Sequence, residues 1–101
     1  MEMQHFPKSN QNGRLVITLP PALKFENYAA LRSSYESEPK DTKVEFDFRK
    51  VTMVDSSALG MLLLAREYFA QAGEPIVFSG YNKHVGKVFS VANFDKLFTL
   101  A

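Results

Sequence analysis

Residues 44–73 constrain the fold of this chain more than any other segment. Residues 44–48 alternate apolar and acidic side chains, which is typical of a strand with one buried face. A short apolar run at 51–54 leads into Asp55-Ser56-Ser57, and a stretch with leucines at helical spacing begins there. A strand that passes into a helix through a short polar turn is the repeating unit of parallel α/β sheets. We therefore predict an α/β domain.

The helix predicted after this turn has an apolar stripe and a clear end. Gly73 follows the periodic stretch and Pro75 comes two residues later, which is the usual pattern after a helix C-terminus. The spacing i, i+3, i+4 and beyond predicts its inward positions: Leu59, Leu62, Leu63, Phe69 and Ala70.

The rest of the chain alternates strands and helices. Asn12-Gly13 is a strong turn signal between apolar segments at 3–6 and 15–19, which predicts an N-terminal hairpin ended by Pro20-Pro21. Spacing predicts a helix over 25–37, with Phe25, Tyr28, Ala29, Leu31 and Tyr35 inward. The remaining predicted elements are a strand at 76–78, a helix with Val85, Val88, Phe89 and Ala92 inward, and a last short helix or strand over 94–100.

This order predicts one α/β domain over residues 1–101. Its sheet is expected to be mixed but largely parallel, with about four to five strands and about four helices joined by right-handed crossovers. The length suits a single domain of this kind.

Composition excludes several functional classes. The formal net charge is +1, so the chain has no strong positive field for direct nucleic-acid binding. It contains no cysteine, which excludes disulfides, a thiol nucleophile and thiolate metal sites. Residues 1–6 lack the features of a signal peptide, and no apolar run approaches the roughly 20 residues of a membrane-spanning helix. We expect a cytoplasmic protein without membrane insertion.

No constellation of catalytic residues is visible. His5 and His84 lie in different predicted elements, and neither has a neighbouring acid or nucleophile. Glu45 and Asp47 are interpreted as the exposed side of an edge-facing or partly covered strand, and the basic side chains at 83–87 as a solvated helix face. The scattered glycines form no phosphate-binding loop. The sequence therefore predicts a protein that is not an enzyme, with no catalytic residue, cofactor or metal site.

The serine pair at the strand-to-helix turn has two explanations. Asp and Ser are favoured N-cap residues, because their side chains accept hydrogen bonds from free helix amides. The same position lies at the carboxyl edge of a parallel sheet, where α/β domains hold their functional residues. Phosphorylation would add roughly −1.5 to −2 charges there. The helix N-terminus favours such an anion and Asp55 repels it, so we expect a changed surface potential on an unchanged fold.

The segment 44–68, with Asp55-Ser56-Ser57-Ala58-Leu59-Gly60 at its centre, resembles the STAS domain family, particularly the bacterial anti-sigma factor antagonists. The similarity extends to 15–19, 75–78 and 85–91. It implies a phosphorylation-controlled partner-switching protein that regulates transcription indirectly. The unphosphorylated form would bind an anti-sigma factor that is also a serine kinase, and a metal-dependent serine phosphatase would restore that form.

The same resemblance assigns the site residues. Ser56, the first serine after the aspartate, is the implied phosphate acceptor, with Ser57 as the runner-up. Asp55 would shape the acceptor site and the partner surface. Ser57, Leu59 and Gly60 would set the helix start and the contact face.

One segment departs from the family pattern. Many members carry Gly-x-Leu-Asp after the second strand, on the surface of the serine, whereas this chain has Pro21-Ala22-Leu23-Lys24. Lys24 thus reverses a charge on the implied partner-binding surface. This change favours an alternative function, a STAS scaffold that is never phosphorylated or a cytosolic subunit of a membrane lipid-transport complex. The complete Asp55-Ser56-Ser57 turn favours the antagonist.

Overall fold

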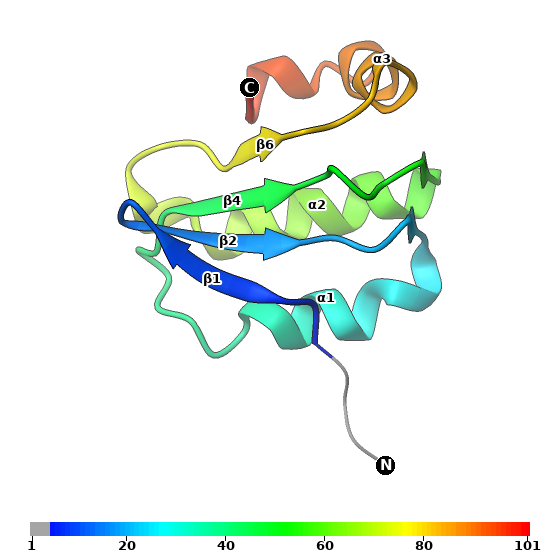
Figure 1. The fold of residues 1–101 in the computed structure, drawn as a ribbon. Coiled ribbons are helices and arrows are strands. Elements are labelled where there is room, and N and C mark those ends of the chain that lie inside the picture. Colours follow the sequence, from blue (N-terminus) through cyan, green and yellow to red (C-terminus); the bar gives the residue numbers. More distant parts are fainter. Residues whose placement is uncertain (1–4) are drawn as a thin grey trace.

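A five-stranded sheet in the order β1-β2-β4-β6-β7 forms the centre of the structure (Figure 1). The computed structural model describes residues 5–101. β1 is antiparallel to β2, and the other neighbours in this sheet are parallel, as the sequence predicts. The strands are β1 (Lys8–Gln11), β2 (Arg14–Thr18), β4 (Val44–Asp47), β6 (Val77–Ser79) and β7 (Thr99–Leu100).

The helices lie on one face of the sheet and at one end of it. α1 and α2 lie side by side behind the strands, and α3 lies at the end of the sheet beyond β6 (Figure 1). Within residues 5–101 there are three α-helices, where the sequence predicts about four, because several short turns remain 3-10 helices. The helices are α1 (Tyr28–Tyr35), α2 (Ser56–Tyr68) and α3 (Lys83–Val91), and the 3-10 turns are η1 (Phe25–Asn27), η2 (Ala70–Ala72) and η3 (Phe94–Lys96). No described helix has the length and apolar content needed to cross a membrane.

An aromatic cluster joins the sheet to α3 and to the C-terminal segment. The ring of Phe78 on β6 lies 4.8 Å from that of Phe48, 5.0 Å from that of Phe89 and 4.3 Å from that of Phe98, centroid to centroid. All four side chains are buried. Tilted and stacked ring pairs of this kind add to the free energy gained by apolar burial. They fix α3 relative to the sheet.

The N-terminal hairpin is confirmed, but its first strand is not where the apolar pattern predicts it. Asn12 and Gly13 both have positive φ, 54° and 79°, as a two-residue type I′ turn requires. The strand before the turn is the exposed, polar Lys8–Gln11. In the predicted segment 3–6, residues 3 and 4 lie outside the described part, and Phe6 precedes β1. The turn, rather than hydrophobicity, sets the pairing.

Two predicted apolar helix faces include residues that the structure leaves exposed or half-buried. Phe25 lies in η1 and is 68% exposed, because the α-helix begins only at Tyr28. In α2, Ala70 lies beyond the helix and is exposed, and Leu59 and Leu63 are half-buried. The buried residues within α2 are Ala58, Met61, Leu62 and Ala65. Small alanines there allow close packing of α2, which leucine spacing does not reveal.

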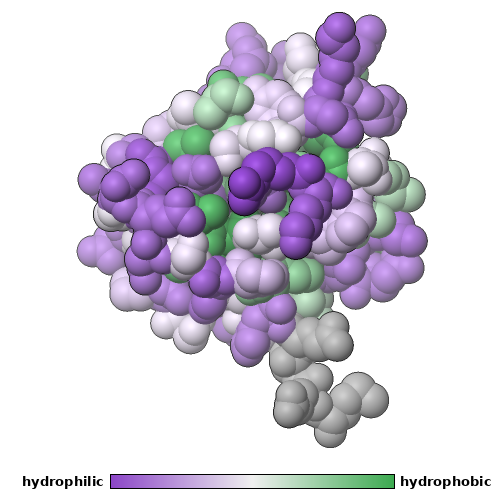
Figure 2. Space-filling model, in the orientation of Figure 1, coloured by the Kyte–Doolittle hydropathy of each residue, from purple (hydrophilic) through white to green (hydrophobic). Residues whose placement is uncertain are grey.

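The outward face of β4 is more buried than alternation predicts. Asp47 is 5% exposed and its carboxylate is 2.7 Å from the Arg49 guanidinium. Glu45 is half-buried and accepts a hydrogen bond of 2.6 Å from Ser79 on β6. Polar pairs thus occupy this face, and the view with the strands in front is largely hydrophilic (Figure 2).

Candidate functional site

The serine turn is joined to the loop that carries Lys24 by a second, small sheet. β3 (Ala22–Leu23) pairs in parallel with β5 (Met53–Val54). At the end of this pair, the Asp55 amide donates a hydrogen bond of 3.2 Å to the carbonyl of Leu23. The first residues after the two strands, Lys24 and Asp55, therefore lie at the same end of the sheet. The family resemblance implies that these two segments share one surface. The pairing of β3 with β5 places them side by side.

The turn is positioned by the carboxyl ends of the main strands. β2 and β4 point toward the edge of the sheet at which α2 begins (Figure 1). The link from β4 to β5 is held by Asp47, which accepts hydrogen bonds from the Arg49 backbone amide and guanidinium. Burial raises the pKa of Asp47, but the hydrogen bonds from Arg49 outweigh it and hold this pKa below its ordinary value of 3.8. The carboxylate therefore stays charged under this loop.

Asp55 is the N-cap of α2. Its backbone is extended, with φ −97° and ψ 177°, and its carboxylate accepts a hydrogen bond of 2.9 Å from the Ala58 amide. This is the geometry expected for an N-cap side chain. Ser56 and Ser57 follow as the first two residues of the helix, and both are exposed. Capping therefore accounts for Asp55 and leaves the two serines without that structural role.

The first turn of α2 presents a low surface beside Ser56. Leu59 and Gly60 lie at i+3 and i+4 from Ser56, so they share its side of the helix. Leu59 is half-buried, and a Cβ built on Gly60 would meet nothing within 4 Å. A partner can thus approach the helix backbone closely next to the serine. The structure places all of the predicted site residues around one turn: Lys24, Asp55, Ser56, Ser57, Leu59 and Gly60.

The sequence analysis does not predict two exposed apolar residues next to this turn. Phe25 follows Lys24, and Met53 lies on β5 three residues before Ser56; their exposed fractions are 68% and 44%. Phe25 matches the helical spacing of Tyr28 and Leu31, so the pattern assigns it to the core. No local sequence signal distinguishes its exposure, because Phe25 lies in the 3-10 turn η1 just before the helix starts. Large exposed apolar side chains beside a polar turn favour protein binding.

Lys24 is held by local contacts that leave its charge accessible. Its backbone amide donates 2.8 Å to the Asn27 side-chain oxygen, which fixes the start of η1. Its ammonium lies 3.6 Å from the Glu26 carboxylate, and the Lys24 side chain is 38% exposed. Exposed ion pairs of this type contribute little to stability. Lys24 therefore remains available to an acidic group on a partner.

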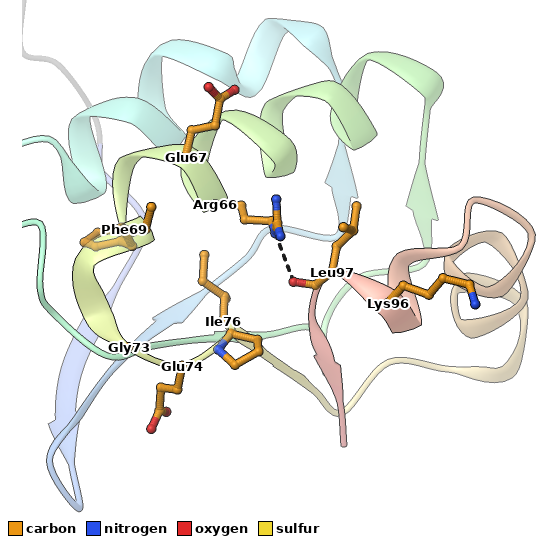
Figure 3. Close-up of a pocket in the computed structure, with 10 residues that line it drawn as sticks. Arg66, Glu67, Phe69, Gly73, Glu74, Ile76, Lys96 and Leu97 are labelled. Carbon is orange, nitrogen blue, oxygen red and sulfur yellow. Dashed lines mark hydrogen bonds between the residues drawn. The ribbon is translucent and has the colours of Figure 1, made fainter.

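A cavity lies at the other end of α2. It has a volume of about 390 Å³ between the helix C-terminus and η3 (Figure 3). Arg66 donates a hydrogen bond of 3.1 Å to the Leu97 carbonyl across it, and the carboxylates of Glu67 and Glu74 point away from each other. Within residues 5–101, no group of three or more histidine and acidic side chains is arranged to hold a metal ion.

Comparison with known proteins agrees with this geometry. A family model described as "Mlab, STAS domain" matches residues 8–100. A STAS-domain containing protein of Pseudomonas aeruginosa (strain UCBPP-PA14) is 31% identical over 88 residues, which cover 86% of this chain and 87% of that protein.

Two solved structures share the fold. A Thermotoga maritima protein, described as a candidate anti-sigma factor antagonist, has a TM-score of 0.74 at 18% identity, over 92% of this chain and 82% of that one. The anti-sigma factor antagonist SpoIIAA in its unphosphorylated form has a TM-score of 0.61 at 15% identity, over 94% of this chain and 99% of that one. At these identities the likeness concerns the fold. Because the family model matches residues 8–100, nearly the whole chain, the chain belongs to the STAS domain family.

Proposed function

We propose that this protein is a cytoplasmic anti-sigma factor antagonist whose binding is controlled by phosphorylation of Ser56. It acts by binding and not by catalysis. The observation that carries the proposal is the division of roles at the turn: Asp55 caps α2, while Ser56 is exposed as the first helical residue. An exposed serine with no capping role, at the carboxyl edge of the sheet, is well placed to enter a kinase active site.

The helix start can hold a phosphate without rearrangement. The first amides of a helix have no intrahelical acceptor, and the helix dipole favours an anion there. Asp55 uses one of these amides, that of Ala58, and its carboxylate would repel a phosphate on the adjacent Ser56. The phosphate would therefore project toward solvent and a bound partner. Phosphorylation changes the docking surface and leaves the core intact.

The surrounding surface supports a protein partner in the unphosphorylated state. Phe25 and Met53 supply exposed apolar contacts, Lys24 a positive charge and Gly60 a place for close approach. An added phosphate of roughly −1.5 to −2 charges would repel acidic groups that Lys24 attracts. We propose an anti-sigma factor with serine kinase activity as this partner, and a serine phosphatase that removes the phosphate from Ser56.

A second candidate function is a STAS scaffold or a cytosolic subunit of a membrane lipid-transport complex, without phosphorylation. Lys24 favours it, because this residue reverses the charge that the resemblance implies at the partner surface. The two candidates differ in one respect: the scaffold should bind its partner equally well with serine or aspartate at position 56.

The experiment compares wild type, Ser56→Ala, Ser57→Ala and Ser56→Asp in lysate of the source cells with ATP. Phosphopeptide mass spectrometry should find phosphate on wild type and Ser57→Ala, and none on Ser56→Ala. As baits, wild type should capture a serine kinase or anti-sigma factor that Ser56→Asp does not capture. Capture of the same transport component by both baits, with no phosphate on Ser56, would establish the second candidate instead.

A further inference from the structure

A groove runs between α2 and α3, starting one helical turn from Ser56. Its volume is about 320 Å³, and its wall on α2 is Leu59. Val91, at the end of α3, is 75% exposed, although it is apolar. The residues that line the groove are Leu59, His84, Lys87, Val88, Val91 and Ala92.

The charged residue among those that line the groove is basic. The lining is mostly apolar; its polar residues are His84 and Lys87, and it contains no acidic side chain. α3 as a whole carries Lys83, His84 and Lys87 and no acid, and all three of these side chains are exposed. A binding partner with acidic side chains beside apolar ones would complement both features.

The extent of the groove suits a short helix as the occupant. Its lining residues on α3 run from His84 to Val91, which span about 10 Å at about 1.5 Å per residue. About two turns of a partner helix match that span and present apolar anchors at i, i+3, i+4 and i+7. We propose that the α2–α3 groove binds an amphipathic helix of a partner protein, with apolar anchors on Leu59, Val88 and Val91 and acidic residues facing Lys87.

The position of the groove links it to the phosphorylation site, a step that rests on the proposed function. Ser56 and Leu59 are at i and i+3, so their Cβ atoms lie about 5–6 Å apart. A phosphate on Ser56 stands at the mouth of the groove and repels the acidic flank of the bound helix. Phosphorylation therefore weakens the binding of an acidic helix and not of a basic one.

Two synthetic 14-residue helical peptides test the groove directly. Both carry leucine at i, i+3, i+4 and i+7; one has glutamate at the flanking positions and the other lysine. Amide chemical shifts of the protein, titrated with the glutamate peptide, should change around Leu59, Val88 and Val91. The Kd of the glutamate peptide should rise at least tenfold with Val91→Asp or Lys87→Glu. Leu64→Asp, a matched change at an exposed apolar position of α2 outside the groove, should leave the Kd within twofold.

Other occupants are separate outcomes of this test. Equal binding of the lysine peptide, no binding of the glutamate peptide at millimolar concentration, or shifts centred on Phe25 and Met53 would overturn the proposal. So would self-association of the free protein that Val91→Asp abolishes, or groove shifts caused by phosphatidylglycerol vesicles alone. Ser56→Asp should weaken the binding of the glutamate peptide and leave the binding of the lysine peptide unchanged. Groove binding without phosphorylation of Ser56 in lysate would refute the proposed function alone, and phosphorylation without groove binding would refute the groove alone.

Discussion

The backbone amide of Asp55 is hydrogen-bonded to the carbonyl of Leu23 at 3.2 Å. This bond ties the turn before Ser56 to the loop that carries Lys24 and Phe25, two segments about thirty residues apart in sequence. Because the bond follows the β3–β5 pair directly, the two segments are held side by side. The Ser56 turn and the Lys24 loop therefore form one continuous surface, which we propose as the docking surface.

Replacing Asp55 tests which residue caps α2. We expect Asp55→Ala to lower the free energy of unfolding by about 1 kcal/mol, because the Ala58 amide loses its side-chain acceptor and keeps only the Asp55 carbonyl. Asp55→Asn keeps an acceptor oxygen and should lose much less. Ser56→Ala is the matched control and should stay within about 0.5 kcal/mol of wild type. Urea unfolding measures all three, and a Ser56→Ala loss equal to that of Asp55→Ala would make Ser56 a structural residue.

Charge at position 56 should control partner binding. We expect Ser56→Asp to weaken the affinity for the captured anti-sigma factor about tenfold or more, because a negative charge enters the docking surface. Ser57→Asp places the same charge one residue along the helix, on a different side, and should weaken it less than threefold. Isothermal titration calorimetry gives both constants. The reverse order of effects would assign the acceptor role to Ser57.

Lys24 should contribute to association more than to folding. We expect Lys24→Asp to weaken partner binding about three- to tenfold, mainly through a slower association rate that depends on salt. Thermal stability should change little, since the Lys24–Glu26 pair is exposed. Lys43→Asp is the control: Lys43 precedes β4, at the opposite edge of the sheet from the serine turn. Equal kinetics for Lys24→Asp and wild type in surface plasmon resonance would place Lys24 outside the interface.

Local sequence signals predict most of this fold because they act over a few residues. The Asn12-Gly13 turn depends on the backbone preferences of two residues, and it is confirmed. The strand β4 is confirmed as an element, and Gly73 ends the 3-10 turn η2 that follows α2. Pairing of β3 with β5 brings Lys24 close to Asp55, and the role of these residues as a binding site stays a prediction.

Local sequence signals do not predict the features that depend on tertiary packing. Phe25 has the spacing of a core residue, but helix α1 starts three residues after it and leaves the ring exposed. Asp47 alternates like an exposed residue, but its pairing with Arg49 allows burial. The groove beside Leu59 needs α3 docked by Phe89 in the aromatic cluster, a contact between distant segments. Long-range packing therefore decides which apolar side chains remain exposed and can contact a partner.

Gly60 should separate stability from binding. It lies inside α2 with open space around it, so Gly60→Ala should raise the free energy of unfolding by about 0.5–1 kcal/mol through helix propensity. The larger Gly60→Gln keeps a good helix former but covers the backbone beside Ser56, and we expect it to weaken partner binding severalfold. Chemical denaturation and calorimetry report the two effects. Tight binding by Gly60→Gln would exclude close approach of the partner at this turn.

Asp47 should give the fold a measurable acid sensitivity. Burial raises its pKa, but the stronger effect of Arg49 lowers the pKa in the folded protein below 3.8, so folding favours the charged carboxylate. The resulting stability is fully present above the ordinary pKa and is lost as the pH falls through the lower folded value. We therefore expect Arg49→Ala to destabilise the protein at pH 7 and to differ less from wild type near pH 3. Urea midpoints measured from pH 7 to pH 3 check this.

Asp41→Asn removes an exposed carboxylate from a loop and serves as the control, with a wild-type profile expected. A constant difference between Arg49→Ala and wild type across this range would show that Arg49 stabilises the loop by packing alone and not through the charge of Asp47.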